Sequence, residues 1–178
     1  MFYPGNARVP EALATDEFLV RPLRASDVTL DYDAVISSRA ELLLGSGGTW
    51  PREEFTLEEN LADLQRHEQE HRDRVAFTYT VMNPAETECL GCIYIGPLER
   101  LLGQDGESGE YLSDRTAYVS FWVRHSRLAD HLDRRLLQAL IPGSKTSGRS
   151  YTFFSSSKRS RNATSSCWRR WDCGFCTA

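Results

Sequence analysis

The sequence predicts one α/β domain, in which strands and amphipathic helices build a single core. A chain of 178 residues is long enough for one sizeable core and too short for two ordinary ones. Its 40% apolar, 26% charged and 11% aromatic residues are typical of a globular protein and exclude collagen-like, coiled-coil and wholly disordered chains. Strand and helix patterns also follow one another in a definite order: a strand, two helices, three strands and a helix.

The first two elements are a strand and a helix. Residues 18–23, F-L-V-R-P-L, are typical of a strand, and Pro22 favours an edge or a strand end because proline cannot donate to a central ladder. Ser26 is expected to cap a following helix, whose apolar residues recur at helical spacing. The glycines that begin at Gly45 end this helix.

A second helix follows, and then three strands. Thr56 and Glu59 predict a capping box, and the helix that they start runs to about Arg74. Residues 77–82 alternate between apolar and smaller polar side chains, which predicts a half-buried strand. The remaining expected elements are strands at 89–95 and 116–124, a polar loop at 99–115, and an amphipathic helix from Leu128 that ends before Pro142.

This order, and the segments that make it up, resemble the GCN5-related N-acetyltransferase (GNAT) family. The matching segments are 18–23, 76–81 (A-F-T-Y-T-V), 89–95 (C-L-G-C-I-Y-I), 117–123 (A-Y-V-S-F-W-V) and 132–141 (L-D-R-R-L-L-Q-A-L-I). The resemblance covers about residues 16–142. It implies an α/β (α+β) GNAT-like acyl-CoA N-acyltransferase fold, in which helices flank a central mixed, mostly antiparallel sheet.

The resemblance implies transfer of an acetyl group from acetyl-CoA, as cosubstrate, to an amine of unknown identity. The backbone around Phe121, Trp122 and Val123 would hold the pantetheine arm, and Arg127 would help to bind the phosphates. Tyr118 aligns with a Glu that many relatives use as a base, so it is the candidate catalytic residue. A tyrosine pKa near 10 also favours the alternative that Tyr118 only lines the cleft.

The phosphate-binding turn departs from the family pattern. GNAT relatives carry Q/R-x-x-G-x-G/A, whereas this chain has Leu128, His131 and Asp133 at the three defining places. Neighbouring arginines could offset the charge of Asp133: Arg124, Arg127, Arg134 and Arg135. A turn without glycine favours a second interpretation, a truncated, non-catalytic GNAT remnant with weak or no CoA binding.

The last 36 residues differ from the rest in composition. Residues 1–142 carry a net charge of −10, and residues 143–178 carry +6 together with nine serines and three of the five cysteines. We therefore divide the chain into an N-terminal extension (1–15), the GNAT-like domain (16–142), and a Ser/Arg/Cys-rich tail (143–178) that is disordered or out of frame.

The genetic code supports a frameshift after about residue 142. If each tail codon is read two bases later, Cys167-Trp168 must give Leu and Trp171-Asp172 must give Gly. With permitted choices elsewhere, Arg161 onward can read E-R-N-Q-L-L-L-E-A-L-G-L-R-V-L, which resembles the last helix and turn of the GNAT family.

Other patterns have simpler interpretations. Cys89-x-x-Cys92 and Cys173-x-x-Cys176 match zinc spacing, but residues three apart on a regular strand face opposite ways, so we expect buried thiols and no metal. The four histidines lie among charged residues and are expected to be solvated. We attribute the basic tail to disorder or a frameshift rather than to nucleic-acid binding. No stretch is typical of a signal peptide or membrane span, so we expect a cytoplasmic protein and no membrane partner.

Overall fold

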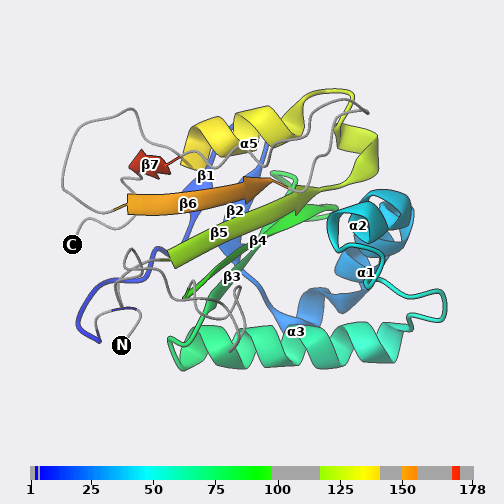
Figure 1. Cartoon of the computed structure of the whole chain (residues 1–178), viewed down its shortest axis with the longest axis horizontal. Coiled ribbons are helices and arrows are strands. Elements are labelled where there is room, and N and C mark those ends of the chain that lie inside the picture. The colour runs from blue at the N-terminus through cyan, green and yellow to red at the C-terminus, as the bar shows by residue number, and fades with distance from the viewer. Residues whose placement is uncertain (1–2, 4, 98–116, 141–149, 156–169, 173–178) are drawn as a thin grey trace.

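A seven-stranded sheet forms the centre of the computed structural model, which describes residues 3, 5–97, 117–140, 150–155 and 170–172 (Figure 1). The strands lie side by side in chain order, and all neighbouring pairs are antiparallel except β5 and β6, which are parallel. The strands are β1 (Leu13–Ala14), β2 (Leu19–Pro22), β3 (Phe77–Met82), β4 (Cys89–Pro97), β5 (Ala117–Val123), β6 (Ser150–Ser155) and β7 (Arg170–Asp172). The mixed, mostly antiparallel sheet predicted from the sequence is confirmed.

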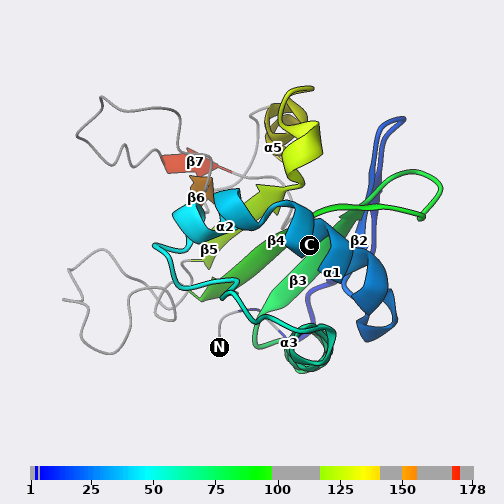
Figure 2. The ribbon, with the colours of Figure 1, turned by 90° about the vertical axis from the view of Figure 1, so that its right-hand side faces the viewer.

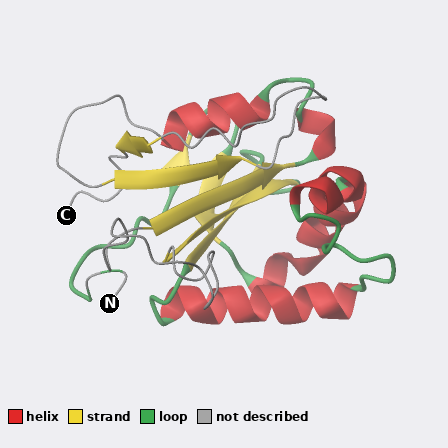
Figure 3. Ribbon diagram, viewed as in Figure 1, coloured by secondary structure: helices red, strands yellow, loops and turns green. Residues whose placement is uncertain are grey.

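Helices cover both faces of this sheet (Figures 2 and 3). They are α1 (Val28–Ser37), α2 (Arg39–Gly45), α3 (Leu57–Arg72) and α5 (Leu132–Leu140), with short 3-10 turns η1 (Ala25–Asp27) and η2 (His125–Arg127). The core is accordingly divided in two. One cluster lies between the sheet and α5, and the other lies between the sheet and α1, α2 and α3.

Strand β3 is more buried than its sequence pattern predicts. All six of its residues are buried, not every second one. Phe77, Tyr79 and Val81 belong to the cluster beneath α5, whereas Met82 belongs to the cluster beneath α1. The expectation of a half-buried strand is wrong because helices cover both faces of the sheet.

The first helical segment begins after a turn and not at Ser26. Ser26 lies inside η1, and Asp27 occupies the N-cap position of α1 without making a side-chain capping bond. The Asp27 carboxylate instead accepts hydrogen bonds from both terminal nitrogens of Arg21, at 2.7 and 3.1 Å. Pro22 is the last residue of β2, as expected from the sequence.

The single helix expected up to Gly45 is broken in two at Ser38. The backbone of Ser38 leaves the helical region, with φ −112° and ψ 14°. Its hydroxyl is buried and accepts the backbone N–H of His125 at 2.9 Å. This bond fastens the break between α1 and α2 to the turn that follows β5, and sequence periodicity alone cannot reveal it.

The last two predicted helices are both present, but only the first of them begins where the sequence predicts. The capping box of α3 is confirmed, because Thr56 accepts the N–H of Glu59 while the Glu59 carboxylate accepts the N–H of Thr56. Helix α5 begins at Leu132, four residues later than expected, because η2 and a turn occupy the preceding residues. Pro142 and the loop predicted at 99–115 lie outside the described residues.

Two end segments also join the fold. Tyr3 and Ala7, in the segment assigned to an N-terminal extension, pack in the core cluster beneath α5. The tail contributes strands β6 and β7, and its other residues lie outside the described part of the chain. Among the described helices, none has the length and apolar character needed to cross a lipid bilayer.

Candidate active site

A cleft of about 330 Å³ opens between helices α2 and α3 and the middle strands of the sheet. Its walls come from segments far apart in the chain: α2 and the turn after it, one face of α3, and strands β4 and β5. The lining residues are Leu42, Gly45, Ser46, Trp50, Asp63, His67, Tyr94, Ser120, Phe121 and Trp122. Most of these are apolar or aromatic, and the titratable groups converge on the α3 side, which is typical of a small-ligand site.

Two aromatic side chains from neighbouring strands are hydrogen-bonded to each other beside this cleft. The indole N–H of Trp122, on β5, donates to the hydroxyl of Tyr94, on β4, at 3.2 Å. Loss of hydration raises the pKa of Tyr94 well above 10. Tyr94 is therefore protonated at neutral pH, so it can donate a hydrogen bond and cannot act as a base.

His67 lies on the α3 wall of the cleft, with its side chain only 17% exposed. Its ring lies 5.4 Å from the Tyr94 ring, centroid to centroid, and its Nδ1 lies 3.3 Å from the Thr78 hydroxyl and 3.4 Å from a Glu70 carboxylate oxygen. Burial, and then the charge of Arg66, lower the pKa of His67 below 6.5. The imidazole is therefore neutral near pH 7, and its Nε2 lies 3.2 Å from a guanidinium nitrogen of Arg66.

A carboxylate accompanies His67 on the same helix face. Asp63 precedes His67 by one helical turn, and both residues line the cleft. An oxygen of Asp63 accepts a hydrogen bond from Arg66 at 2.6 Å. The cleft thus presents a carboxylate that is paired with Arg66 and a neutral imidazole one turn away.

The strand geometry supplies the other side of the site. The parallel register between β5 and β6 runs from Ala117↔Tyr151 to Phe121↔Ser155. Strand β5 continues to Val123, and its opposite edge stays paired with β4 throughout. The last two residues of β5 therefore extend beyond the paired segment of β6, next to the cleft.

The turn between β5 and α5 contains a residue with left-handed backbone. His131 has φ 58°, a conformation that glycine adopts without steric cost. His131 occupies the place where the GNAT pattern has its first glycine. The turn thus has a glycine-like backbone at this residue, although the sequence carries no glycine there.

The arginines of this turn are neutralised by nearby acids. Arg127 donates to a Glu88 carboxylate oxygen at 2.6 Å, and Arg124 donates to Asp33 at 2.6 Å and lies 3.7 Å from Glu88. The buried Nε of Arg127 has no hydrogen-bond partner within the described residues. Arg127, predicted from the sequence to bind the cofactor, therefore has one guanidinium nitrogen held by Glu88, and its Nε is buried away from solvent.

Comparison with solved structures relates this geometry to known proteins. A ribosomal L7/L12 alpha-N-protein acetyltransferase, RimL, in complex with coenzyme A matches with a TM-score of 0.56 and 18% identity, over 80% of this chain and 73% of its own. The Salmonella typhimurium acetyltransferase that modifies the N-terminal serine of L7/L12 matches with a TM-score of 0.54 and 18% identity, over 80% and 74%. The chain has the GNAT fold. The microcin C7 self-immunity acetyltransferase MccE, in complex with acetyl-CoA and AMP, has the same fold, at a TM-score of 0.50 and 11% identity over 78% and 69%. No family model and no curated protein matches the sequence.

Within the GNAT fold, three of the five site residues predicted from the sequence lie at the end of β5 beside the cleft, and the other two lie elsewhere. Phe121 and Trp122 line the cleft, and Val123 follows them at the end of β5. The side chains of Phe121 and Val123 pack in the cluster beneath α5, so these two residues offer a ligand chiefly their backbone. Arg127 lies in the turn beyond. Tyr118 is two residues before Ser120 and is absent from the described cleft lining, and its ring packs over Gly96.

The sequence did not single out His67 as a site residue. His67 and His71 were expected to be solvated, whereas burial lowers the pKa of both. The ring of His71 contacts Phe77 and Tyr79 edge to face, at centroid distances of 5.1 and 5.2 Å. Four-residue spacing places both histidines on one helix face, and that spacing is the signal that could have indicated their burial against β3.

Proposed function

We propose that the chain is an N-acetyltransferase that moves the acetyl group of acetyl-CoA to a primary amine. The observation that carries the proposal is the position of the cleft within the GNAT fold. The cleft joins a buried, neutral imidazole, His67, to the end of β5 where the parallel strand pairing stops. This arrangement suits a reaction in which an amine is deprotonated beside a thioester.

In this proposal each group has one task. The Asp63 carboxylate attracts the ammonium form of the acceptor into the cleft, and the His67 imidazole takes a proton from it. The freed amine attacks the thioester carbon, a C–N bond forms and the C–S bond breaks. The departing thiolate receives a proton, so that acetyl-amine and CoA thiol are the products. The extended backbone at Trp122 and Val123 offers hydrogen bonds to the pantetheine arm, and the partly exposed guanidinium of Arg127 attracts the phosphates.

The acceptor and the compartment belong to the same proposal. The aromatic wall formed by Trp50 and Trp122 favours an amine attached to an apolar group. Two structural neighbours are described as modifying the N-terminus of a ribosomal protein, which supports the α-amine of a protein or peptide as the first acceptor to test. We propose that the chain acts in the cytoplasm.

The second candidate, a non-catalytic remnant, is favoured by the ion pairs of the turn. Glu88 and Asp33 already occupy donors of Arg127 and Arg124, so less positive charge is available to a pyrophosphate. In this alternative the same fold binds CoA weakly or not at all.

Calorimetry and a transfer assay with the full chain separate the two candidates. Acetyl-CoA is titrated into the protein, and the amine-dependent release of CoA thiol is then measured over a panel of short peptides with free α-amines. A saturating heat signal together with peptide-dependent thiol release supports the enzyme. The absence of heat at millimolar acetyl-CoA excludes catalysis by this chain.

Two variants assign the proton transfer. His67→Gln removes the base, and we expect kcat to fall by about 10² to 10⁴-fold. Tyr118→Phe removes the hydroxyl that aligns with the base of many GNAT relatives. If Tyr118→Phe abolishes turnover and His67→Gln does not, the role proposed for His67 is wrong.

A further inference from the structure

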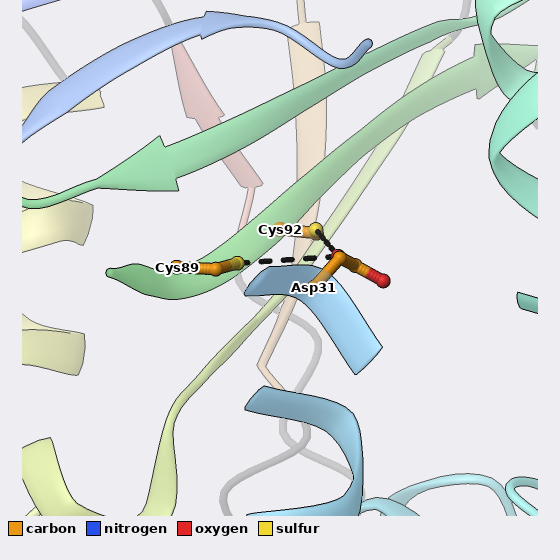
Figure 4. A group of neighbouring side chains, drawn as sticks. All are labelled: Asp31, Cys89 and Cys92. Carbon is orange, nitrogen blue, oxygen red and sulfur yellow. Dashed lines mark hydrogen bonds between the residues drawn. The ribbon is translucent and has the colours of Figure 1, made fainter. Parts of the chain in front are cut away.

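Three buried side chains between helix α1 and strand β4 lie within reach of one another (Figure 4). Oδ1 of Asp31 lies 3.4 Å from Sγ of Cys92 and 3.9 Å from Sγ of Cys89. The ligand atoms of all three residues lie within 4.8 Å of one another, and no side chain of the group is more than 3% exposed. The group belongs to neither the cleft nor the turn after β5.

The two cysteines face the same side of β4 because the strand is irregular between them. Val81 on β3 pairs with Gly91, but the next residue, Met82, pairs with Cys89, so one residue of β4 is skipped. Gly91 has φ 152°, which favours glycine. This bulge reverses the usual alternation. The expectation that Cys89 and Cys92 face opposite ways is therefore wrong.

We propose that Asp31, Cys89 and Cys92 form a binding site for a thiophilic divalent cation of the zinc type. A tetrahedral zinc ion has Zn–S bonds of about 2.3 Å and Zn–O bonds of about 2.0 Å, which separate a ligating oxygen from a ligating sulfur by about 3.5 Å. The oxygen-to-sulfur separations of 3.4 and 3.9 Å in this group are close to that distance. Two thiolates and a carboxylate are also the hard and soft donors that zinc accepts together.

The neighbour of the cluster supports this assignment. Asn60, on α3, is 1% exposed, and its amide donates to Oδ2 of Asp31 at 2.9 Å. This bond fixes the carboxylate so that Oδ1 points at the two sulfurs (Figure 4). Metal centres commonly have such a neighbour, which binds the carboxylate oxygen that does not face the metal and so orients the ligand.

The bonding of the carboxyl group gives a second argument. Asp31 has one strong partner, the Asn60 amide, and its other two contacts are thiols, which are weak hydrogen-bond donors. Binding of a divalent cation releases the two thiol protons and replaces those weak bonds with metal–ligand bonds. Three protein ligands leave the fourth tetrahedral position open. The ion would link α1 to the sheet and stabilise the folded chain by a free energy that grows with the logarithm of its affinity.

Cobalt is the probe for the test, because cobalt bound to thiolates gives charge-transfer absorption that cobalt bound to oxygen ligands lacks. The tail also contains cysteines, so the parent is the full-length chain with Cys167→Ser, Cys173→Ser and Cys176→Ser. The chain is refolded with Co²⁺ under a non-thiol reductant, since the ligands are buried after folding. We expect stoichiometric cobalt and the thiolate band in the parent. Asp31→Asn, Cys89→Ser and Cys92→Ser are each expected to weaken binding more than about tenfold.

Thr80→Val is the matched control. Thr80 is buried, pairs with Cys92 across the strands, and has a hydroxyl without a hydrogen-bond partner in the described region. This variant is expected to keep cobalt and its band. Thermal unfolding checks that every variant is folded, and elemental analysis after dialysis counts the metal. A folded parent chain that takes up no cobalt or zinc overturns the proposal, and so does a thiolate band that survives in Cys89→Ser and Cys92→Ser alike.

Discussion

Gly91 lies so close to Trp122 that a Cβ atom on Gly91 would fall 2.1 Å from the Trp122 carbonyl oxygen. The backbone of Gly91 also has φ 152°, which side chains rarely adopt. Gly91 stays paired with Val123 of β5, and the bulge in the ladder with β3 lies at the residue of β4 next to Gly91. The residue beside the bulge therefore contacts the wall of the cleft at Trp122, while the bulge itself sets the direction of the nearby cysteines.

Replacement of Gly91 with alanine tests this relationship. We expect Gly91→Ala to lower the free energy of unfolding by about 3 kcal/mol or more, because backbone strain and overlap with a backbone oxygen act together. Urea unfolding followed by circular dichroism measures the loss. Gly5→Ala is the control, since nothing lies within 4 Å of a Cβ at Gly5. If both variants unfold at the same urea concentration, the close contact is not a constraint on the fold.

This bulge also shows why part of the fold could not be predicted from the sequence. The strand at 89–95 and its hairpin partner follow from local apolar patterns, which the structure confirms. The skipped residue follows from how two strands meet, and its only trace in the sequence is a glycine. A single skipped residue exchanges the faces of all residues beyond it, so the interpretation of Cys89 and Cys92 failed even though the strand was correct.

The pH dependence of acetyl transfer reports on His67. Because His67 must be neutral to accept a proton, kcat/KM is expected to fall as the pH decreases through its lowered pKa, below 6.5. Initial rates between pH 5 and pH 8 at low peptide concentration measure this limb. His71→Gln is the matched control, since His71 shares the helix face but lies outside the cleft lining. An acidic limb that disappears in His71→Gln contradicts the assignment.

The same two histidines make the stability of the fold depend on pH. Burial lowers the pKa of His67 and of His71 in the folded chain, so the unfolded chain binds more protons as the pH falls below about 7. Stability is therefore expected to be greatest above 6.5 and to decrease as the pH falls toward the lowered values. The slope is at most about 1.4 kcal/mol per pH unit for each group. Urea midpoints at pH 7.5 and pH 5.5 test this, and a His67→Gln/His71→Gln variant is expected to show a smaller difference between them.

The Arg21 ion pairs stabilise the connection between β2 and α1. The guanidinium is nearly buried and binds Asp27 with two nitrogens and Glu86 with Nε at 2.6 Å. Arg21→Met leaves both carboxylates without this partner. We expect a loss of about 2 kcal/mol, less than for a fully buried pair, because Glu86 is 43% exposed. Arg8→Met removes a fully solvated pair with Glu11 and is expected to change stability by less than about 0.5 kcal/mol. Equal urea midpoints for the two variants would contradict a stabilising role for the Arg21 ion pairs.

Prediction of the candidate site from the sequence was uneven for a physical reason. The sequence predicted Phe121 and Trp122, which line the cleft, because their strand has a strong local pattern and a definite place in the GNAT layout. His67 and Tyr94 meet only when α3 packs across the sheet, 27 residues apart in the chain. Charged neighbours on α3 masked the burial of His67, because one helix can present a solvated face and a buried face with the same polar composition.

The turn after β5 offers the last prediction. His131 holds a left-handed backbone that costs a non-glycine residue about 1 kcal/mol, and it stands where the GNAT pattern has glycine. His131→Gly is expected to raise the free energy of unfolding by about 0.5 kcal/mol, since the relief of strain exceeds the added entropy of the unfolded chain. If the turn binds the phosphates of acetyl-CoA, the same change is expected to tighten that binding, because glycine lets a phosphate approach the backbone. Ser126→Gly, in the same turn, is the control and is expected to lower stability slightly. Urea unfolding and calorimetry with acetyl-CoA measure the two effects separately, and a destabilised His131→Gly variant would show that the histidine side chain supports the turn.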